Sequence, residues 1–269
     1  MFAEALAHPS ALEVSRTLAE FSRRATEMRP FNRADGPVEK QILSFIAKMS
    51  KTISSCQPWS SYSSTDFTKS LEAFHRIMFS RLPLQILYPR DIDDLEALDN
   101  TFFMKLEAIA NFSSGLETWW GDFSKPKANF LPQVKAAACK EIQLMSKQYT
   151  PAGKANCIVR AAQFLASVDA GPHIEVPDLR VISLFATVLL TGPAITGLLI
   201  QLAFLRRFRT ALQGHPSVTA ICNLDAAVYL FYFLDIILQV ERSKCLHFKF
   251  YQPVFNYTLL VLLSFKILN

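Results

Sequence analysis

The sequence predicts an all-α protein, a helical bundle that carries an N-terminal helical extension. Only 8 of the 269 residues are glycine, so the many tight turns of a β-sandwich or barrel are not expected. Hydrophobic residues make up 51% and charged residues 19% of the chain, a balance that favours a folded core over disorder. Apolar residues recur at steps of three and four, the spacing of amphipathic helices, and the sequence has no useful length of strand-like alternation.

Residues 1–37 are expected to form a helical extension and a linker. Residues 3–28 have helical spacing, and the Pro, Asn and Gly of residues 29–37 interrupt it. A new apolar stripe begins after this linker, so residues 38–66 are interpreted as the helical lead-in of the bundle. Residues 54–64 form a serine-rich connection within that lead-in.

A further apolar stripe over residues 67–82 predicts the next helix. Its N-cap is expected at Ser64 or Thr65, because a side-chain oxygen there can accept from a first-turn amide.

Residues 91–94 place three aspartates in the first turn of another helix, where carboxylates complement the helix dipole. A calcium site is not expected there, since the Gly and Glu spacing of an EF-hand is missing. Later helices are expected over residues 131–149 and 154–168, and from Pro177–Asp178 onward.

Two uncharged runs, residues 182–205 and 250–265, leave a helical membrane protein as an alternative. The first run has 24 residues, a length that can cross a bilayer. However, Pro193 lies in its middle, where proline is costly in a helix. Two helices of about 10–14 residues separated by a turn are therefore favoured. Residues 239–269 are an apolar tail of unknown role, through which peripheral membrane contact remains open.

Charge and cysteine content exclude several classes of function. The formal net charge is +5, without the concentrated basic stripe that nucleic-acid binding usually needs, so no nucleic-acid partner is expected. The densest cluster, Arg206, Arg207 and Arg209, is interpreted as one solvated helix face. The five cysteines are scattered without a CxxC pair, and the N-terminus has no signal peptide, which favours reduced thiols in the cytoplasm.

The sequence contains no motif for catalytic chemistry of its own. It has no His pair at helical zinc spacing, no glycine-rich phosphate loop and no GxSxG nucleophile turn, so neither a metal nor a cofactor is expected. Cys56 or Cys157 with His75 could be imagined as a nucleophile and base, but their spacing favours buried structural residues. The chain is therefore interpreted as a helical protein that acts on a partner.

Residues 38–238 carry an ordered series of short motifs. This series resembles the Vps-nine domain, the catalytic module of exchange factors for Rab GTPases of the early endosome. The resemblance implies a Vps-nine-like catalytic domain over residues 67–238, a Rab GTPase as partner, and a cytoplasmic protein of endocytic vesicle trafficking at endosomal membranes. The motifs are Phe45 to Met49, Gln57-Pro58-Trp59, Leu71 to Leu82, Leu106 to Phe112, Tyr149 to Lys154, Val176 to Leu179 running on to Gly192-Pro193, Ala211 to Gly214, and Asn223-Leu224.

The resemblance also implies a mechanism and a set of residues. Exchange factors of this family insert an acidic side chain toward the phosphate and Mg²⁺ site of the GTPase, where it competes for the lysine that holds the phosphates. Asp178 corresponds to that acid, with Glu175 as the alternative if the register slips. The resemblance assigns GTPase binding to Pro193, Thr219, Cys222 and Asn223.

Several positions depart from the family pattern. Thr219-Ala220 stands where the family has a tyrosine pair, and Cys222 replaces a threonine. Pro177 stands in place of one of two adjacent acids, and Gly153 replaces the acid of the turn before Lys154. A Rab-binding scaffold that has lost exchange activity is therefore an alternative to the active exchange factor.

Overall fold

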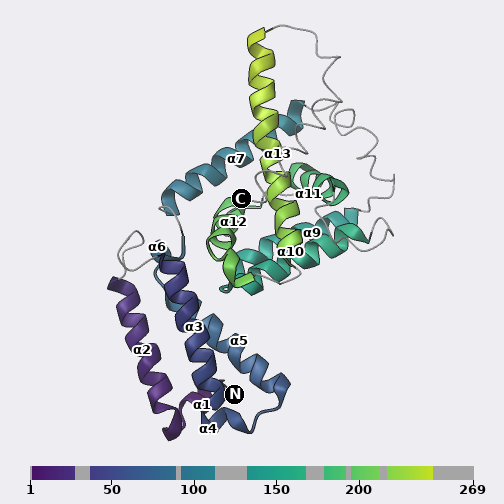
Figure 1. Cartoon of the computed structure of the whole chain (residues 1–269). Coiled ribbons are helices and arrows are strands. Elements are labelled where there is room, and N and C mark those ends of the chain that lie inside the picture. The colour runs from purple at the N-terminus through teal and green to yellow at the C-terminus, as the bar shows by residue number, and fades with distance from the viewer. Residues whose placement is uncertain are drawn as a thin grey trace. The chain divides into compact units, whose positions relative to one another are not determined.

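A computed structural model describes residues 2–27, 37–88, 92–112, 132–167, 179–191, 195–212 and 217–244. All regular secondary structure in these residues is helical (Figure 1), which confirms the prediction of an all-α helical bundle. The helices are α1 (Phe2–Leu6), α2 (Leu12–Glu27), α3 (Val38–Ser55), α4 (Gln57–Ser60), α5 (Ser64–Arg81), α6 (Leu84–Leu87), α7 (Ile92–Phe112), α9 (Pro132–Gln143), α10 (Pro151–Ala166), α11 (Leu179–Thr191), α12 (Leu198–Arg207) and α13 (Ser217–Lys244), with short 3-10 turns at Pro9–Ala11, Leu144–Lys147 and Arg209–Leu212.

The helices are divided between two compact units, and the chain contributes to each unit more than once. The first unit contains the described residues within 1–96, 146–154 and 199–213. The second unit contains the described residues within 97–145, 155–198 and 214–269. The succession of segments expected from the sequence (1–37, 38–66, 67–238 and 239–269) remains a prediction.

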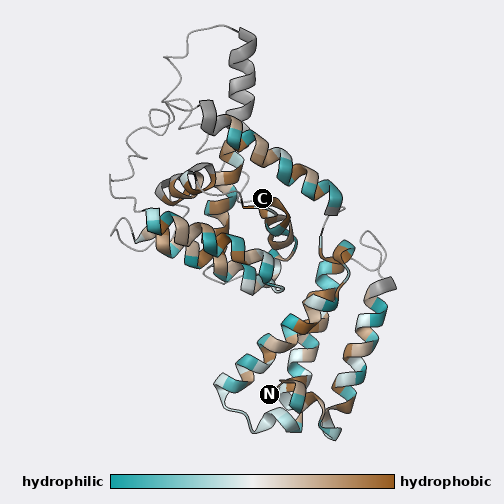
Figure 2. Cartoon of the chain, turned by 180° about the vertical axis from the view of Figure 1, so that it is seen from behind, coloured by the Kyte–Doolittle hydropathy of each residue, from teal (hydrophilic) through white to brown (hydrophobic). Residues whose placement is uncertain are grey.

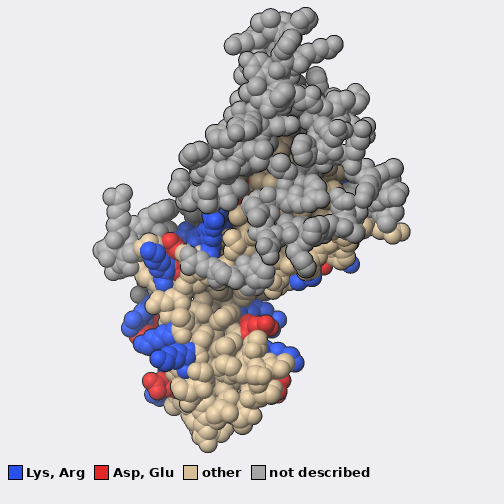
Figure 3. Space-filling model, turned by 45° about the vertical axis from the view of Figure 1, so that its right-hand side comes forward, with Lys and Arg blue, Asp and Glu red and all other residues tan. Residues whose placement is uncertain are grey.

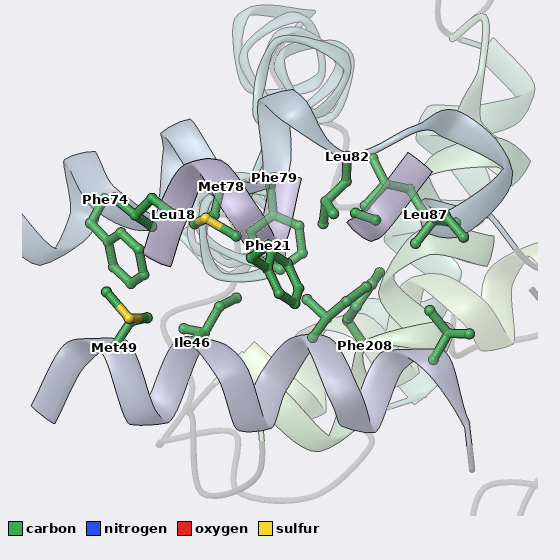
Figure 4. Close-up of a cluster of buried hydrophobic side chains, with 14 of the residues drawn as sticks. Leu18, Phe21, Ile46, Met49, Phe74, Met78, Phe79, Leu82, Leu87 and Phe208 are labelled. Atoms are coloured by element: carbon green, nitrogen blue, oxygen red, sulfur yellow. The ribbon is translucent and has the colours of Figure 1, made fainter. Parts of the chain in front are cut away.

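The first unit has a hydrophobic core to which helices from distant parts of the chain contribute (Figure 4). Helix α3 places one side chain per turn in it, and helices α2, α5 and α12 supply the facing side chains. Helices on both sides of the boundary expected near residue 37 thus share one core. Each fully buried aliphatic or aromatic side chain contributes about 1.5–3 kcal/mol, so this packing holds the short helices in place. The core includes Leu18, Phe21, Ile42, Ile46, Met49, Ile53, Phe74, Met78, Phe79, Phe204 and Phe208.

The hydropathy of these helices follows the packing. Helices α2, α3 and α5 alternate apolar and polar residues along their length, as expected for helices with one buried face (Figure 2). Phe21 of α2 and Phe45 of α3 stack with ring centroids 3.7 Å apart and planes 9° apart. This ring pair joins the two helices on either side of the linker.

Local structure differs from the sequence-based expectation at two places in the first unit. The helix expected over residues 3–28 is interrupted near Pro9, because proline lacks an N–H donor and clashes with the preceding turn. Ser63, rather than Ser64 or Thr65, caps α5, and its Oγ accepts the N–H of Asp66 at 3.1 Å. Both differences shift helix ends without changing which face is buried.

In the second unit, helix α11 packs against α13 and α9. The buried face of α11 includes Val181, Phe185 and Val188, spaced three or four residues apart. Arg160 of α10 donates from Nε to Oε2 of Glu141 on α9 at 2.8 Å. Helix α11 thus packs against α13 and α9, and a partly exposed ion pair joins α10 to α9.

The uncharged run of residues 182–205 forms parts of two short helices, as expected. Helix α11 has 13 residues and α12 has 10, and Gly197 stands directly before α12 with a φ of 77°. Within the residues that the structure describes, no helix is both long and apolar enough to cross a membrane. The second uncharged run, residues 250–265, lies outside the described residues.

Candidate functional site

Helix α13 carries three of the residues that the Vps-nine resemblance assigns to GTPase binding. Thr219 and Cys222 are half-buried on its surface. Asn223, on the next position, is buried with 2% of its surface exposed. Thr219 and Cys222 are therefore the members of this set that a partner can reach directly.

The side chain of Asn223 has an unusual environment. Its Oδ1 is buried and accepts no hydrogen bond from any described residue. A buried acceptor without a donor costs about 1–3 kcal/mol. Direct contact between Asn223 and a GTPase would require this side chain to become accessible.

The proposed acid directly precedes helix α11 in the sequence. Asp178, its alternative Glu175, and Pro193 lie outside the described residues. Helix α11 begins at Leu179, the residue after Asp178, and its last residue is Thr191. A carboxylate at the N-terminus of a helix is favoured by the helix dipole.

The structure brings the two parts of the predicted surface into the same unit. Helix α11 follows Asp178 in the sequence, helix α13 carries Thr219 and Cys222, and the two helices pack against each other (Figure 1). The fold therefore makes neighbours of segments that lie about forty residues apart in sequence.

Asp99 is a residue of the second unit that sequence reasoning missed. Its carboxylate is 3% exposed, and Oδ2 accepts the backbone N–H of Gly197 at 2.6 Å. This bond ties helix α7 to the turn that precedes Leu198. A signal was present in the sequence, since Asp99 stands at helical spacing from the apolar positions Phe102 and Leu106.

The first turn of α10 contains Gly153 and Lys154, both part of the motif series. Lys154 is 3% exposed, its Nζ donates to Oε1 of Gln201, and it lies 5.1 Å from the centroid of the Phe204 ring. Lys154 thus anchors the first turn of α10 to α12 within the first unit. A Cβ added to Gly153 would lie 2.9 Å from Oγ1 of Thr150, so a larger residue there would require that side chain to shift.

The residues weighed as a nucleophile and base have ordinary structural contacts. Cys157 is fully buried and accepts from Nη2 of Arg160 at 3.3 Å, whereas Cys56 lies 3.4 Å from the carbonyl of Ser10. Nε2 of His75 lies 3.4 Å from Oγ of Ser50. His75 belongs to the first unit and Cys157 to the second. Cys56, Cys157 and His75 thus each have a contact with another residue of the folded protein.

Neither metal binding nor a uniform charge field is evident in the described part of the chain. No group of three or more His, Cys, Asp or Glu side chains there could hold a metal ion. Burial raises the pKa of the Cys139 thiol, which favours the unreactive protonated form. On the face drawn in Figure 3, basic and acidic side chains are interspersed.

Comparison with known proteins adds no relative. No protein-family model matches this chain, and no curated protein shows significant similarity to it. The resemblance to the Vps-nine domain depends on the ordered motifs alone.

Proposed function

We propose that this protein is a guanine nucleotide exchange factor that promotes GDP release from a Rab GTPase of the early endosomal class. It acts in endocytic vesicle trafficking, in the cytoplasm at endosomal membranes. The observation that carries the proposal is the packing of α11 against α13. This packing makes neighbours of the helix that follows Asp178 and the helix that carries Thr219 and Cys222.

In the proposed mechanism, the α11–α13 pair contacts the switch regions of the GTPase. Thr219 and Cys222 provide contacts from α13, and Asp178 directs its carboxylate toward the phosphate site from the start of α11. The carboxylate competes with the nucleotide phosphates for the lysine that binds them. Nucleotide affinity falls because the exchange factor binds the nucleotide-free GTPase more tightly than the GDP-bound form.

The second candidate is a Rab-binding scaffold without exchange activity. It is favoured by the side chains present on α13. Threonine and cysteine at positions 219 and 222 are small and half-buried, and Asn223 is buried. Strong interfaces usually centre on large aromatic or arginine side chains, so this surface offers less binding energy than a tyrosine pair would.

The deciding experiment measures release of a fluorescent GDP analogue from a panel of early endosomal Rab proteins. The wild-type protein is expected to accelerate release, and Asp178→Asn to abolish the acceleration, because the substitution keeps the shape and removes the charge. Asp94→Asn, at an exposed position of α7, is the matched control. Glu175→Gln tests the alternative register. The proposal is wrong if the wild type accelerates release from no member of the panel.

Binding to different nucleotide states separates the two candidates. An exchange factor binds the nucleotide-free GTPase best, whereas a scaffold that follows activation binds the GTP form best. Thr219→Arg places a large cation on the half-buried face of α13 and is expected to weaken either kind of binding. Thr68→Arg, at an exposed position of α5, is the control. Equal binding to all nucleotide states contradicts both candidates.

A further inference from the structure

Helix α3 of the first unit has an exposed face on which every charged residue is a lysine. The structure describes all side chains of α3, and seven of its positions are exposed. At about 100° of rotation per residue, these positions lie within about 120° of the helix circumference, so they form one continuous face. We refer to these residues as the α3 face: Lys40, Ser44, Ala47, Lys48, Lys51, Ser54 and Ser55.

The single acid of α3 lies outside the α3 face. Glu39 is half-buried and lies about 120° around the helix from the centre of the face. Its Oε2 is 3.8 Å from Nη2 of Arg207 on α12, a side chain that is only 8% exposed. Among the described residues, no acid lies within ion-pair distance of Lys40, Lys48 or Lys51. The positive charge of the α3 face is therefore not neutralised locally.

The helices beside α3 differ from it in charge pattern. Helices α2 and α5 both contact α3 (Figure 1), and their exposed positions mix acids with bases. Glu13 and Glu20 are exposed on α2 together with Arg16, and Glu72 is exposed on α5 together with Arg76. Unbroken positive charge is thus a property of the α3 face and not of all three helices.

The composition of the α3 face distinguishes between classes of anionic partner. Protein interfaces centre on aromatic or arginine side chains and are poor in lysine, and single-stranded nucleic acids bind where bases can stack on aromatic rings. The α3 face has neither aromatic nor arginine side chains. An anionic lipid surface needs neither, because it attracts each lysine near it by charge alone.

The shape of the α3 face also suits a flat surface. Lys40 and Lys51 are eleven residues apart, about 17 Å along the helix. The exposed residues between them, apart from Lys48, are the short Ser44 and Ala47. Because lysine side chains are long and flexible, all three ammonium groups can extend past these neighbours to the same plane.

We propose that the α3 face contacts an anionic lipid membrane. The contact is electrostatic, and each lysine strengthens it about fivefold. Three lysines therefore orient the first unit on a membrane rather than anchor it there. The inference rests on the proposed function only for the presence of a membrane, and binding to vesicles without any GTPase tests it separately.

Sedimentation of the full-length protein with lipid vesicles measures this contact. Binding is expected to rise when phosphatidylserine is added to phosphatidylcholine vesicles. It should weaken with salt, since the Debye length falls from about 10 Å at 0.1 M to about 3 Å at 1 M. Replacing all three lysines (Lys40→Gln, Lys48→Gln and Lys51→Gln) is expected to lower the affinity about hundredfold.

A second triple variant removes the same charge from other helices of the first unit. It combines Arg16→Gln, Arg76→Gln and Arg81→Gln, at exposed positions of α2 and α5, and should lose less than about tenfold. Equal losses in the two triple variants would show that net charge alone governs binding and would overturn the proposal. An unchanged affinity of the lysine variant would place any membrane contact elsewhere, with the same consequence.

Direct binding to other polyanions tests the choice of lipid. Tighter binding to poly(U) RNA or to polyglutamate than to the phosphatidylserine vesicles, lost in the lysine variant, would overturn the proposal. Failure of the wild type to release GDP from any Rab protein would contradict the proposed function and leave the vesicle result standing.

Photocrosslinking locates the contact on the helix. A benzoylphenylalanine at Ala47, within the α3 face, is expected to attach to lipid of the phosphatidylserine vesicles. The same probe at Ala19, an exposed alanine of α2, is the matched control. A lipid yield at position 47 no higher than at position 19 would rule out the α3 face as the membrane contact.

Discussion

The carboxylate of Asp99 and the backbone N–H of Gly197 form a 2.6 Å hydrogen bond between residues 98 positions apart. Gly197 has a φ of 77°, a conformation that side chains with a Cβ rarely adopt. The buried acid thus meets a turn that depends on glycine. This pair fixes the turn before Leu198 relative to α7 within the second unit.

Replacing either partner of this pair is expected to destabilise the protein. Asp99→Ala removes a charge-assisted hydrogen bond and should lower the free energy of unfolding by about 1.5–3 kcal/mol. Gly197→Ala forces a Cβ into the left-handed region at a cost of about 1–2 kcal/mol. Urea unfolding followed by circular dichroism measures both. Glu96→Gln, an exposed substitution on the same helix, should change stability by less than either; an equal loss would contradict the role of the pair.

Gln201→Leu is expected to destabilise the first unit by about 1.5–3 kcal/mol, because it removes an acceptor of the buried Lys154 ammonium. Leucine has a similar volume, so the effect reports the lost hydrogen bond rather than a cavity. Gln163→Leu, at an exposed position of α10, is the matched control in the same denaturation experiment. Similar midpoints for the two variants would mean that Lys154 does not depend on Gln201.

Trp59 allows two substitutions with different expected costs. Its ring is 2% exposed, and its Nε1 has no hydrogen-bond partner in the described structure. Trp59→Ala should cost about 3–5 kcal/mol through the lost burial and the cavity. Trp59→Phe should cost far less, because it keeps most of the apolar contact and removes an unsatisfied donor. Comparable losses of stability in the two variants would indicate that the indole N–H finds a partner.

Folding stability should depend on pH through His75. Burial lowers the pKa of His75 below its ordinary value of 6.5, and the charge of Glu72 partly offsets this. The unfolded state then binds the proton more readily, so the free energy of unfolding falls as the pH drops through 6.5 and below. His75→Gln should flatten this part of the stability profile, and the exposed His8→Gln should not. A profile unchanged by His75→Gln would rule out this contribution.

Much of the fold follows from local sequence patterns. The three- and four-residue spacing of apolar residues predicted the helices and the buried face of α3, because that face is a property of a single helix. The break in the run of residues 182–205 was likewise visible from Pro193 and its neighbours. The ends of helices were less certain, and Ser63 rather than Ser64 or Thr65 caps α5.

The candidate site could be predicted only in part. The sequence placed Thr219, Cys222 and Asn223 on one helical segment, but it could not separate the two half-buried residues from the buried Asn223. Exposure depends on which neighbouring helix covers each position. The spacing of Asp99 from Phe102 and Leu106 indicated a buried position, but its partner Gly197 is distant in sequence, and the bond between them exists only in the folded chain.

The sequence by itself determined that the chain is helical, that several of its helices have one apolar face, and that no common catalytic motif is present. Tertiary structure decided that residues 199–213 join the helices of the first unit and that α11 lies against α13. The physical reason is the range of the interactions. Helix periodicity is set by hydrogen bonds four residues apart, whereas burial and the pairing of polar groups depend on contacts between segments that the chain brings together only when it folds.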